Sequence, residues 1–361
     1  MDKFVKGEVL SHFGGDNYAA IVYKYRRDTL LSALNNIVIY AMNDGNKVPI
    51  KINARVGIYP ILEEDTPEKV MTAASEALSI ARAEKREVFV ITPKVQEKIV
   101  VQKLLLHEFD RALSKKIIEV YYQPKINVET GKIIGAEALA RWNRKGEILM
   151  PKQFIPLLEK NRKSFDLDIY VLKKVCKDLK KWKEMGLDIV PVSVNISRQD
   201  ICDDDRGPKD TADIILRIIE EAGIDPSLIM LEVTETTDAN EQKQLFEFMT
   251  ELCLEGIATS IDDFGTGYSS LSILRDFPIT EIKIDKSFIS YERLGKNDEI
   301  IVRSIISMAK KLGIDVITEG VETEEQIRFL KEQGCVKVQG FFYDAPLEEG
   351  IWEDRLRIGT Y

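Results

Sequence analysis

The sequence predicts an α/β protein: a modified (β/α)8 TIM barrel with one antiparallel strand, preceded by a small N-terminal α+β domain. Three observations support this prediction. Short β-rich runs alternate with amphipathic helical segments after Glu119, a hairpin pattern opens that alternation, and the residues before Pro93 follow a different order of elements. We therefore expect an N-terminal domain over 1–93, a connecting helix over 94–115 and a barrel over 116–361.

The N-terminal domain is expected to open with a β-hairpin. Two β-rich runs, Val9–Phe13 and Tyr18–Lys24, flank the turn Gly14-Gly15-Asp16-Asn17, and glycine-containing turns of this kind join paired strands. The elements expected next are a helix over 28–42, a strand over 48–58, a helix from Pro67 and a short strand over 88–91.

Apolar residues at helical spacing between Val95 and Leu113 predict a connecting helix with one buried face. A helix that transmits signals between domains is the alternative interpretation. The spacing is the same in both cases and does not choose between them.

The barrel is expected to begin with a hairpin over 119–142, which makes one strand antiparallel. Helices over 151–158 and 167–185 follow it. Later strands are expected at 190–197, 228–235, 256–264, 280–289, 314–322 and 336–343. The helices expected between and after them are 211–222, 240–254, 269–275, 297–312, 323–332 and one near Glu349.

Composition disfavours several classes of function. The 361 residues include 60 Asp and Glu against 51 Lys and Arg, and this net charge of −9 argues against a surface that tracks duplex nucleic acid. The sequence predicts no membrane-spanning segment and no signal peptide, so a cytoplasmic protein is expected. Four cysteines without a C-x-x-C pair and only two histidines disfavour disulfides, zinc sites and histidine-based catalysis.

Polar residues are expected at the barrel rim, where the catalytic groups of this fold lie. A polar side chain at one strand end is ordinary, but seven consecutive strands that each end in an acid, an amide or a lysine indicate a site. These residues are Glu137, Asn195, Glu232, Glu235, Asp262, Asp263, Lys283, Asp285, Glu319, Glu322 and Gln339.

The carboxylates of this set predict bound divalent cations. So many carboxylates at one barrel mouth cannot all ionise unless cations compensate them. Oxygen ligands without histidine or thiolate favour Mg²⁺ or Mn²⁺. The adjacent Asp262 and Asp263 would let one carboxylate bridge two ions about 4 Å apart, a geometry used to cleave phosphodiesters.

Two basic residues and one loop complete the expected site. Lys283 is the one cation among the strand-end acids, and either a buried ion pair that holds the barrel together or a lysine that orients water or meets phosphate fits this position. Arg141 can bind an anionic group through two parallel hydrogen bonds. The glycine-containing loop from Asp263 to Ser270 follows the acidic pair and is a candidate gate.

The motifs of the barrel segment form a set that resembles a known family. They are Tyr122-Gln123-Pro124, Glu137-Ala138-Leu139 with Arg141-Trp142, Asn195 in VSVNIS, Glu232 in LEVTE, Asp262-Asp263-Phe264-Gly265-Thr266-Gly267, Lys283 in IKIDKSFI, Glu319-Gly320-Val321-Glu322 and Gln339-Gly340. In combination they resemble the EAL domain, the cyclic-di-GMP phosphodiesterase, over about residues 105–350.

The resemblance implies hydrolysis of cyclic di-GMP to linear pGpG with two Mg²⁺ or Mn²⁺ ions. Its implied ligands are Glu137, Asn195, Glu232 and Asp262 for one ion, and Asp262, Asp263 and Glu319 for the other. Its implied catalytic residues are Lys283, which would align the attacking water, Glu319 as general base, and Glu322 with Gln339 in support.

The same resemblance implies further roles outside the metal ligands. Gln123, Arg141 and Gln339 match positions that contact or surround the substrate, and Glu235 matches a glutamate that anchors the loop from Asp263 to Ser270. A homodimer formed through the barrel is implied by the family alone. The segment after Trp142 lacks the usual His-Pro and is shortened, and 160–165 lacks the usual glycine, which puts substrate affinity in doubt more than catalysis.

The N-terminal domain resembles the later part of a GGDEF (diguanylate cyclase) domain through Phe13-Gly14-Gly15-Asp16-Asn17. Asn17 stands where that signature has a carboxylate, and the earlier metal-binding part is absent from this chain. A neutral amide does not replace a charged ligand in a two-metal site, so no cyclase activity is expected. An ordinary tight hairpin turn explains the glycines equally well.

Three functions are compatible with these residues. The first is an active phosphodiesterase, and the second is a non-catalytic cyclic-di-GMP receptor or scaffold. A different barrel enzyme that uses Mg²⁺ on another phosphate or an enolate is the third. The retained acids favour the first, because a retired enzyme would be expected to have lost some of them.

Overall fold

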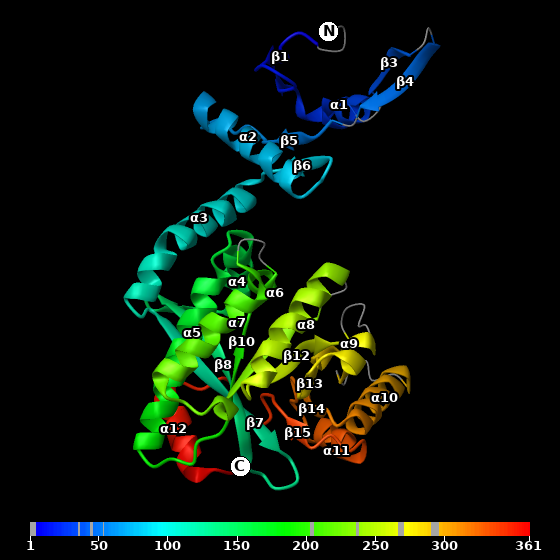
Figure 1. The fold of residues 1–361 in the computed structure, drawn as a ribbon. Coiled ribbons are helices and arrows are strands. Elements are labelled where there is room, and N and C mark those ends of the chain that lie inside the picture. Colours follow the sequence, from blue (N-terminus) through cyan, green and yellow to red (C-terminus); the bar gives the residue numbers. More distant parts are fainter. Residues whose placement is uncertain are drawn as a thin grey trace. The chain divides into compact units, whose positions relative to one another are not determined.

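The computed structural model describes residues 5–34, 37–43, 46–52, 54–202, 206–235, 238–265, 271–289 and 296–361. The chain forms two compact units, Met1–Leu104 and Leu105–Tyr361 (Figure 1). Each unit has its own buried apolar core. The boundary falls within helix α3 (Pro93–Ser114), which occupies the segment where a connecting helix is expected.

The first unit is a small α+β assembly. Its described strands form three two-stranded sheets, of which β1 with β2 and β3 with β4 are antiparallel and β5 with β6 is parallel. In chain order its elements are β1 (Val9–His12), β2 (Tyr18–Ile21), η1 (Lys24–Arg26), α1 (Arg27–Leu34), β3 (Ile37–Asn43), β4 (Asn46–Ile52), β5 (Val56–Ile58), α2 (Pro67–Ala83) and β6 (Val88–Val90).

The helix predicted over 28–42 is wrong in its second half. Helix α1 ends at Leu34, and the strand β3 begins at Ile37 and pairs with β4. The run Ile37-Val38-Ile39-Tyr40 is β-branched and aromatic, and such residues favour a pleated, paired conformation over a helix. The strand predicted over 48–58 is likewise two strands, β4 and β5, which belong to different sheets.

Close packing of β5 on α2 explains one glycine of this unit. A Cβ atom at Gly57 would lie 2.2 Å from the backbone nitrogen of Leu78 and 2.6 Å from the carbonyl oxygen of Ala74. Small residues on the helix, Ala73 and Ala77, are buried in the same core. Glycine therefore permits the strand and the helix to approach at a distance that no other residue allows.

The second unit is a closed eight-stranded barrel, as predicted. The order around the ring is β7, β8, β10, β11, β12, β13, β14 and β15, and β15 pairs with β7 to close it. Strand β7 is antiparallel to both neighbours, whereas the other pairings of the ring are parallel. The strands are β7 (Ile118–Asn127), β8 (Ile133–Arg144), β10 (Val192–Asn195), β11 (Ile229–Thr234), β12 (Ala258–Phe264), β13 (Glu281–Ile284), β14 (Asp315–Thr318) and β15 (Lys337–Val338).

Helices follow the barrel strands and surround the ring (Figure 1). A short strand, β9 (Glu147–Leu149), lies outside the ring and pairs antiparallel with the end of β8. The helices are α4 (Pro151–Lys160), α5 (Ser164–Glu184), α6 (Arg198–Ile201), α7 (Gly207–Ala222), α8 (Ala239–Leu254), α9 (Leu271–Asp276), α10 (Lys296–Leu312), α11 (Glu324–Glu332) and α12 (Glu349–Ile358), with 3-10 turns η2 (Pro226–Leu228) and η3 (Lys286–Phe288).

The six barrel strands from β10 to β15 are all shorter than predicted, and at β13, β14 and β15 the difference shapes the rim. Strand β13 ends at Ile284 because Asp285 accepts the Ser287 N–H at 2.9 Å and starts the 3-10 turn η3. Strand β14 ends at Thr318, and β15 contains only Lys337 and Val338. Lys283 stays within β13, whereas the other polar residues expected inside the ends of these strands lie in the segments that follow them: Asp285, Glu319, Glu322 and Gln339.

Successive side chains of β7 point alternately into the outer apolar layer and into the barrel. The buried ring of Tyr122 packs against Trp182 with a centroid distance of 4.9 Å, and its hydroxyl donates to Asp178 Oδ2 at 2.5 Å. The next residue, Gln123, contacts Gln339 instead. Successive side chains of a strand point to opposite faces, so anchoring Tyr122 in the outer layer directs Gln123 to the opposite side.

Within the part of the chain that the structure describes, no helix combines the length and the apolar character needed to cross a membrane.

Candidate active site

A single buried lysine gathers four carboxylates from four places in the ring. Lys283 on β13 is 1% exposed. Its Nζ lies 3.4 Å from Glu137 Oε2 and 3.2 Å from Asp262 Oδ1. It also forms ion pairs with Glu232 on β11 and with Glu319 directly after β14. Strand ends that are distant in sequence thus converge on one ammonium group.

A local irregularity in β12 brings two adjacent acids to the same place. Neighbouring residues of a regular strand point to opposite faces, but the pairing of β12 with β13 shifts between Ile261 and Phe264. Asp263 there adopts a positive φ of 51°. Its backbone N–H donates to Asp262 Oδ1 at 2.9 Å. A bulge of this kind re-aims a side chain, and here it turns Asp263 toward the face that Asp262 occupies.

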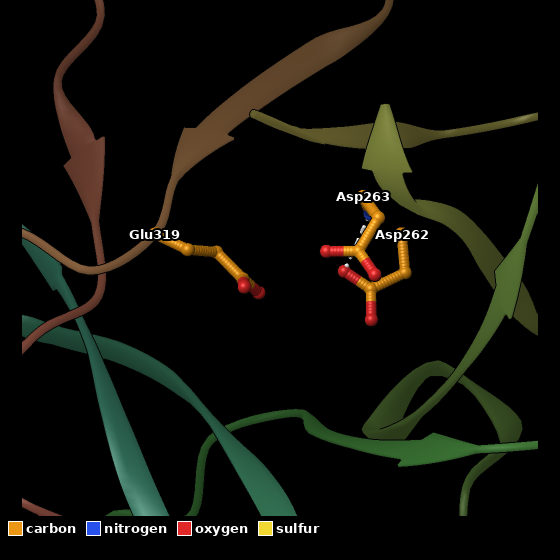
Figure 2. A group of neighbouring side chains, drawn as sticks. All are labelled: Asp262, Asp263 and Glu319. Carbon is orange, nitrogen blue, oxygen red and sulfur yellow. Dashed lines mark hydrogen bonds between the residues drawn. The ribbon is translucent and has the colours of Figure 1, made fainter. Parts of the chain in front are cut away.

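The result is a group of three carboxylates with the spacing of metal ligands. One oxygen each from Asp262, Asp263 and Glu319 lie within 4.8 Å of one another. Figure 2 shows the two aspartates side by side and the Glu319 carboxylate directed toward them from the opposite side. Carboxylate oxygens, in a set that contains no histidine nitrogen or cysteine sulfur, are the ligands that hard divalent cations prefer.

Amide side chains fix the orientation of Glu137. Asn195 Nδ2 donates to Glu137 Oε1 at 2.8 Å, and Gln339 Nε2 donates to Glu137 Oε2 at 2.6 Å. Gln339 Nε2 also lies 3.0 Å from Gln123 Oε1. Gln123 is the direct partner of Glu137 in the β7–β8 register. Four of the predicted residues therefore form one hydrogen-bonded group.

Burial and neighbouring charges shift the pKa values of this cluster in two directions. Burial and neighbouring carboxylates raise the pKa of Glu319 to about 8, although Lys283 opposes the shift. Burial likewise raises the pKa of Glu137, Asp262 and Asp263. Burial also acts on Glu232, but two lysines outweigh it and lower its pKa to about 2. One carboxylate is therefore held ionised while the others resist ionisation without further cations.

The charge of the cluster fits two divalent cations. Six carboxylates and two ammonium groups meet here, so full ionisation leaves four negative charges, the charge that two divalent cations neutralise. The groups are Glu137, Glu232, Asp262, Asp263, Glu281, Glu319, Lys125 and Lys283. The donor set can hold Mg²⁺ or Mn²⁺ and has no preference for zinc.

The predicted residues Arg141, Glu322 and Glu235 lie outside this cluster. Arg141 is buried on the same face of β8 as Glu137, where Nη1 donates to its neighbour's carbonyl, Ala140 O, at 2.9 Å and Cζ lies 5.5 Å from the Tyr121 ring centroid. Glu322 is exposed. Its backbone N–H donates to Gln326 Oε1 at 2.7 Å, next to the capping box of α11.

Glu235 follows β11, and its carbonyl oxygen accepts a hydrogen bond from Arg198 Nη1 at 2.7 Å. The loop that Glu235 is expected to anchor runs from Asp263 to Ser270, and 266–270 lie outside the described residues. The loop's gating role and the Glu235 contact to it therefore stay predictions.

Sequence reasoning missed two charged residues beneath the rim. Lys125 Nζ lies 2.8 Å from Glu232 Oε1 and 3.2 Å from Glu281 Oε1. A usable signal existed, because Lys125 is two residues beyond Gln123 and Glu281 is two residues before Lys283. The period of two along a strand places each on the same face as a predicted site residue.

Comparison with known proteins gives a consistent assignment. A family model described as the EAL domain matches residues 107–346. The bifunctional diguanylate cyclase/cyclic di-GMP phosphodiesterase MucR of Pseudomonas aeruginosa is 29% identical over 347 residues, which is 94% of this chain and 50% of MucR. The cyclic di-GMP phosphodiesterase NbdA of the same organism is 30% identical over 356 residues, 97% of this chain and 45% of NbdA. The chain thus spans about half the length of these relatives.

Solved structures agree in fold. The PaMucR phosphodiesterase in complex with c-di-GMP has a TM-score of 0.64 and 33% identity, and the match covers 69% of this chain and 99% of that one. An EAL domain protein from Listeria monocytogenes EGD-e has a TM-score of 0.57 and 30% identity over 70% of this chain and 98% of that one. With two thirds of its length matched by the family model and the family's motifs gathered at one barrel mouth, this chain belongs to the EAL-domain family.

Proposed function

We propose that this protein is a cyclic-di-GMP phosphodiesterase that opens the cyclic dinucleotide to linear pGpG with two Mg²⁺ or Mn²⁺ ions. The observation that carries the proposal is the convergence of Asp262, Asp263 and Glu319, with oxygens within 4.8 Å, beside the buried Lys283. Membership of the EAL family and the names of the relatives MucR and NbdA support it.

The ligand assignment follows the two sides of the cluster. Glu137, Asn195, Glu232 and Asp262 would hold one ion, and Asp262, Asp263 and Glu319 would hold the other. Bound there, the ions would lower the pKa of a water molecule and stabilise charge on the phosphate. Asn195 and Gln339 keep the Glu137 carboxylate in one orientation through the hydrogen bonds described above.

Lys283 and Glu319 carry the chemical step in this proposal. Lys283 aligns the attacking water, and Glu319 accepts its proton as the new bond to phosphorus forms and the P–O3′ bond breaks. The departing O3′ takes up a proton from solvent, and the product is linear. Glu322 and Gln339 are assigned supporting positions around metal and water.

Substrate contacts are assigned to residues beside the cluster. Gln123 and Gln339 are hydrogen-bonded to each other at 3.0 Å, and Arg141 lies further along the same face of β8. We assign Gln123 and Arg141 to the dinucleotide, where a guanidinium offers two parallel donors to a phosphate. Glu235 is assigned to anchoring the loop that follows Asp263.

The N-terminal unit is proposed to be a partial GGDEF-like domain without cyclase activity, over residues 1–93, joined by a connecting helix over 94–115 to the barrel at 116–361. The reason is Asn17, a neutral side chain where the signature has an acid. We also propose a cytoplasmic homodimer that forms through the barrel and does not bind duplex nucleic acid.

A product assay tests the proposed function. The full chain is incubated with cyclic di-GMP and Mg²⁺ or Mn²⁺, with an EDTA control, and the nucleotides are separated by chromatography. We expect linear pGpG with either metal and none with EDTA. Binding of cyclic di-GMP with the substrate left intact would identify a receptor instead, and absence of binding would point to another barrel enzyme.

A further inference from the structure

Beneath the rim of the barrel, a second buried lysine contacts the site from the side away from solvent. Lys125 on β7 is 5% exposed, and its Nζ lies between two carboxylates, 2.8 Å from Glu232 Oε1 and 3.2 Å from Glu281 Oε1. Glu232 and Glu281 are themselves 0% and 4% exposed. Burying three charges is costly unless each is paired, so this arrangement needs a reason.

The backbone is shaped to admit this side chain. Lys125 pairs in register with Gly135 on β8. A Cβ at Gly135 would lie 3.5 Å from Cδ of Lys125 and 3.2 Å from the carbonyl oxygen of Pro191. The absence of a side chain at Gly135 leaves the lysine stem room to cross toward β11 and β13.

Glu281 holds the other side of the Lys125 ammonium. It is aligned with Ser260, which is in turn aligned with Glu232, so the three residues stand at one level on β13, β12 and β11. Lys125 therefore bridges two acids that are one strand apart. Glu281 lies two residues before Lys283 on the same strand, which places it on the same face below the rim.

The two lysines divide the oxygens of Glu232 between them. Lys125 takes Oε1, and Lys283 contacts Oε2. Lys283 is shared among four carboxylates at the rim, whereas Lys125 contacts Glu232 from below. A ligand whose far oxygen is held by a buried cation is fixed in rotation, and its near oxygen is directed at the rim.

We propose that Lys125, braced by Glu281, is a positioning residue that orients Glu232 for a divalent cation. The inference rests on the proposed function only in taking Glu232 as a metal ligand. Lys125 does not touch the substrate in this account, and it acts through Glu232. A cation is used because it fixes the carboxylate while leaving it ionised.

Charge and position predict opposite effects when Lys125 is removed. A positive charge close to a metal site repels the metal, so its loss by charge alone would tighten metal binding. Loss of orientation would weaken it, because outer partners of metal ligands typically contribute about 10- to 100-fold in affinity. The sign of the change in metal affinity therefore separates the two roles. A purely structural role would leave the metal affinity unchanged.

The experiment measures Mn²⁺ affinity of the full chain by the EPR signal of free Mn²⁺, without substrate. We expect Lys125→Met to bind Mn²⁺ at least about 10-fold more weakly than the unaltered protein. Lys125→Arg, which keeps the charge, should recover part of the affinity. Lys243→Met is the matched control, because Lys243 lies 3.8 Å from Glu247 in an exposed ion pair on helix α8, and it should leave the affinity unchanged.

A double variant keeps the test informative if Lys125→Met does not fold. Replacing both partners of a buried ion pair by apolar residues is tolerated much better than removing one. Lys125→Met/Glu281→Met should therefore fold and still bind Mn²⁺ at least about 10-fold more weakly. Recovery of the unaltered affinity would mean that Lys125 only balances the charge of Glu281, and would overturn the proposal.

The outcomes separate this inference from the proposed function. Unchanged or tighter Mn²⁺ binding by Lys125→Met overturns the positioning role, whatever the unaltered chain does to cyclic di-GMP. Mn²⁺ binding by the unaltered chain without pGpG formation overturns the proposed function and leaves the positioning role standing. A chain that does not bind Mn²⁺ at all overturns both.

Discussion

The residues around Lys283 illustrate how one ammonium group organises a site that it cannot neutralise. Four carboxylates contact it, and it is almost fully buried. A buried group with several hydrogen-bonding partners is held in one place, yet most of the negative charge around it stays uncompensated. This imbalance is the physical reason for placing divalent cations among the same oxygens.

Glu137→Gln tests the ligand role of Glu137 at the residue scale. The change keeps the shape and removes the charge that Asn195, Gln339 and Lys283 surround. We expect turnover to fall by more than about 100-fold, because a lost ligand removes several kcal/mol of transition-state stabilisation. Thermal unfolding should stay cooperative. Glu247→Gln, an exposed surface glutamate near Lys243, is the control, and full activity of Glu137→Gln at saturating Mg²⁺ would remove Glu137 from the metal ligands.

Lys283→Met distinguishes catalysis from substrate binding. If Lys283 aligns the attacking water, its loss affects the transition state more than the bound substrate, so kcat should fall while the substrate Kd changes little. Steady-state kinetics gives kcat. Binding of cyclic di-GMP gives Kd when it is measured with Ca²⁺, whose longer and more flexible coordination should not support turnover. A large rise in Kd with kcat preserved would reassign Lys283 to binding the substrate.

The protonation of the acids predicts a pH-dependent stabilisation by metal. Burial raises the pKa of Glu319 from 4.5 to about 8, and a group with a raised pKa contributes stability that is lost as the pH rises through the folded-state value. The protein in EDTA should therefore lose stability between about pH 5 and pH 8. Metal ions replace the missing protons, so the rise in Tm caused by Mn²⁺ should be larger at pH 8 than at pH 6. An equal rise at both values would contradict this account.

At the scale of elements, the order of strands and helices was predictable because their periods differ. The barrel segments alternate between β-rich runs and amphipathic helices, and each expected helix from 151 onward has a counterpart near its predicted bounds. The short β13, β14 and β15 were not predictable in length, because a cap such as Asp285 and tertiary pairing decide where a strand ends.

The site was predictable in composition and less so in geometry. Strand-end position indicated Glu137, Glu232, Asp262, Lys283 and Glu319, which meet as expected. The bulge that brings Asp263 beside Asp262 depends on a positive φ and a register shift, and residue pattern alone does not reveal either. Lys125 and Glu281 were not predicted because they lie one layer below the strand ends on which the prediction was based.

At the scale of the whole molecule, the two units have separate apolar cores among the described residues. The smaller core contains Tyr59, Ala73, Ala77 and Ile91. A small core of this size contributes little stability by itself. Its integrity therefore depends on close approach of its elements, as at Gly57.

Gly57→Ala should destabilise the first unit without affecting the barrel. Its Cβ would lie 2.2 Å from a backbone atom of α2, so the strand and helix must separate at a cost of about 1–3 kcal/mol. Hydrogen exchange measured by mass spectrometry should rise in peptides from 54–91 and stay unchanged in peptides from 118–343. Ser75→Ala, at an exposed position of the same helix, is the control, because it adds no volume to the core. Exchange that rises equally in the barrel would show that the two units unfold together.

The central claim is that a pair of divalent cations lies among these carboxylates, and anomalous diffraction from crystals grown with Mn²⁺ tests it most directly. We expect two Mn²⁺ peaks about 4 Å apart that share Asp262, with Glu137, Asn195 and Glu232 on one ion and Asp263 with Glu319 on the other. No anomalous peak at this barrel mouth in ample Mn²⁺, or ligand side chains that point to separate places, would contradict the claim.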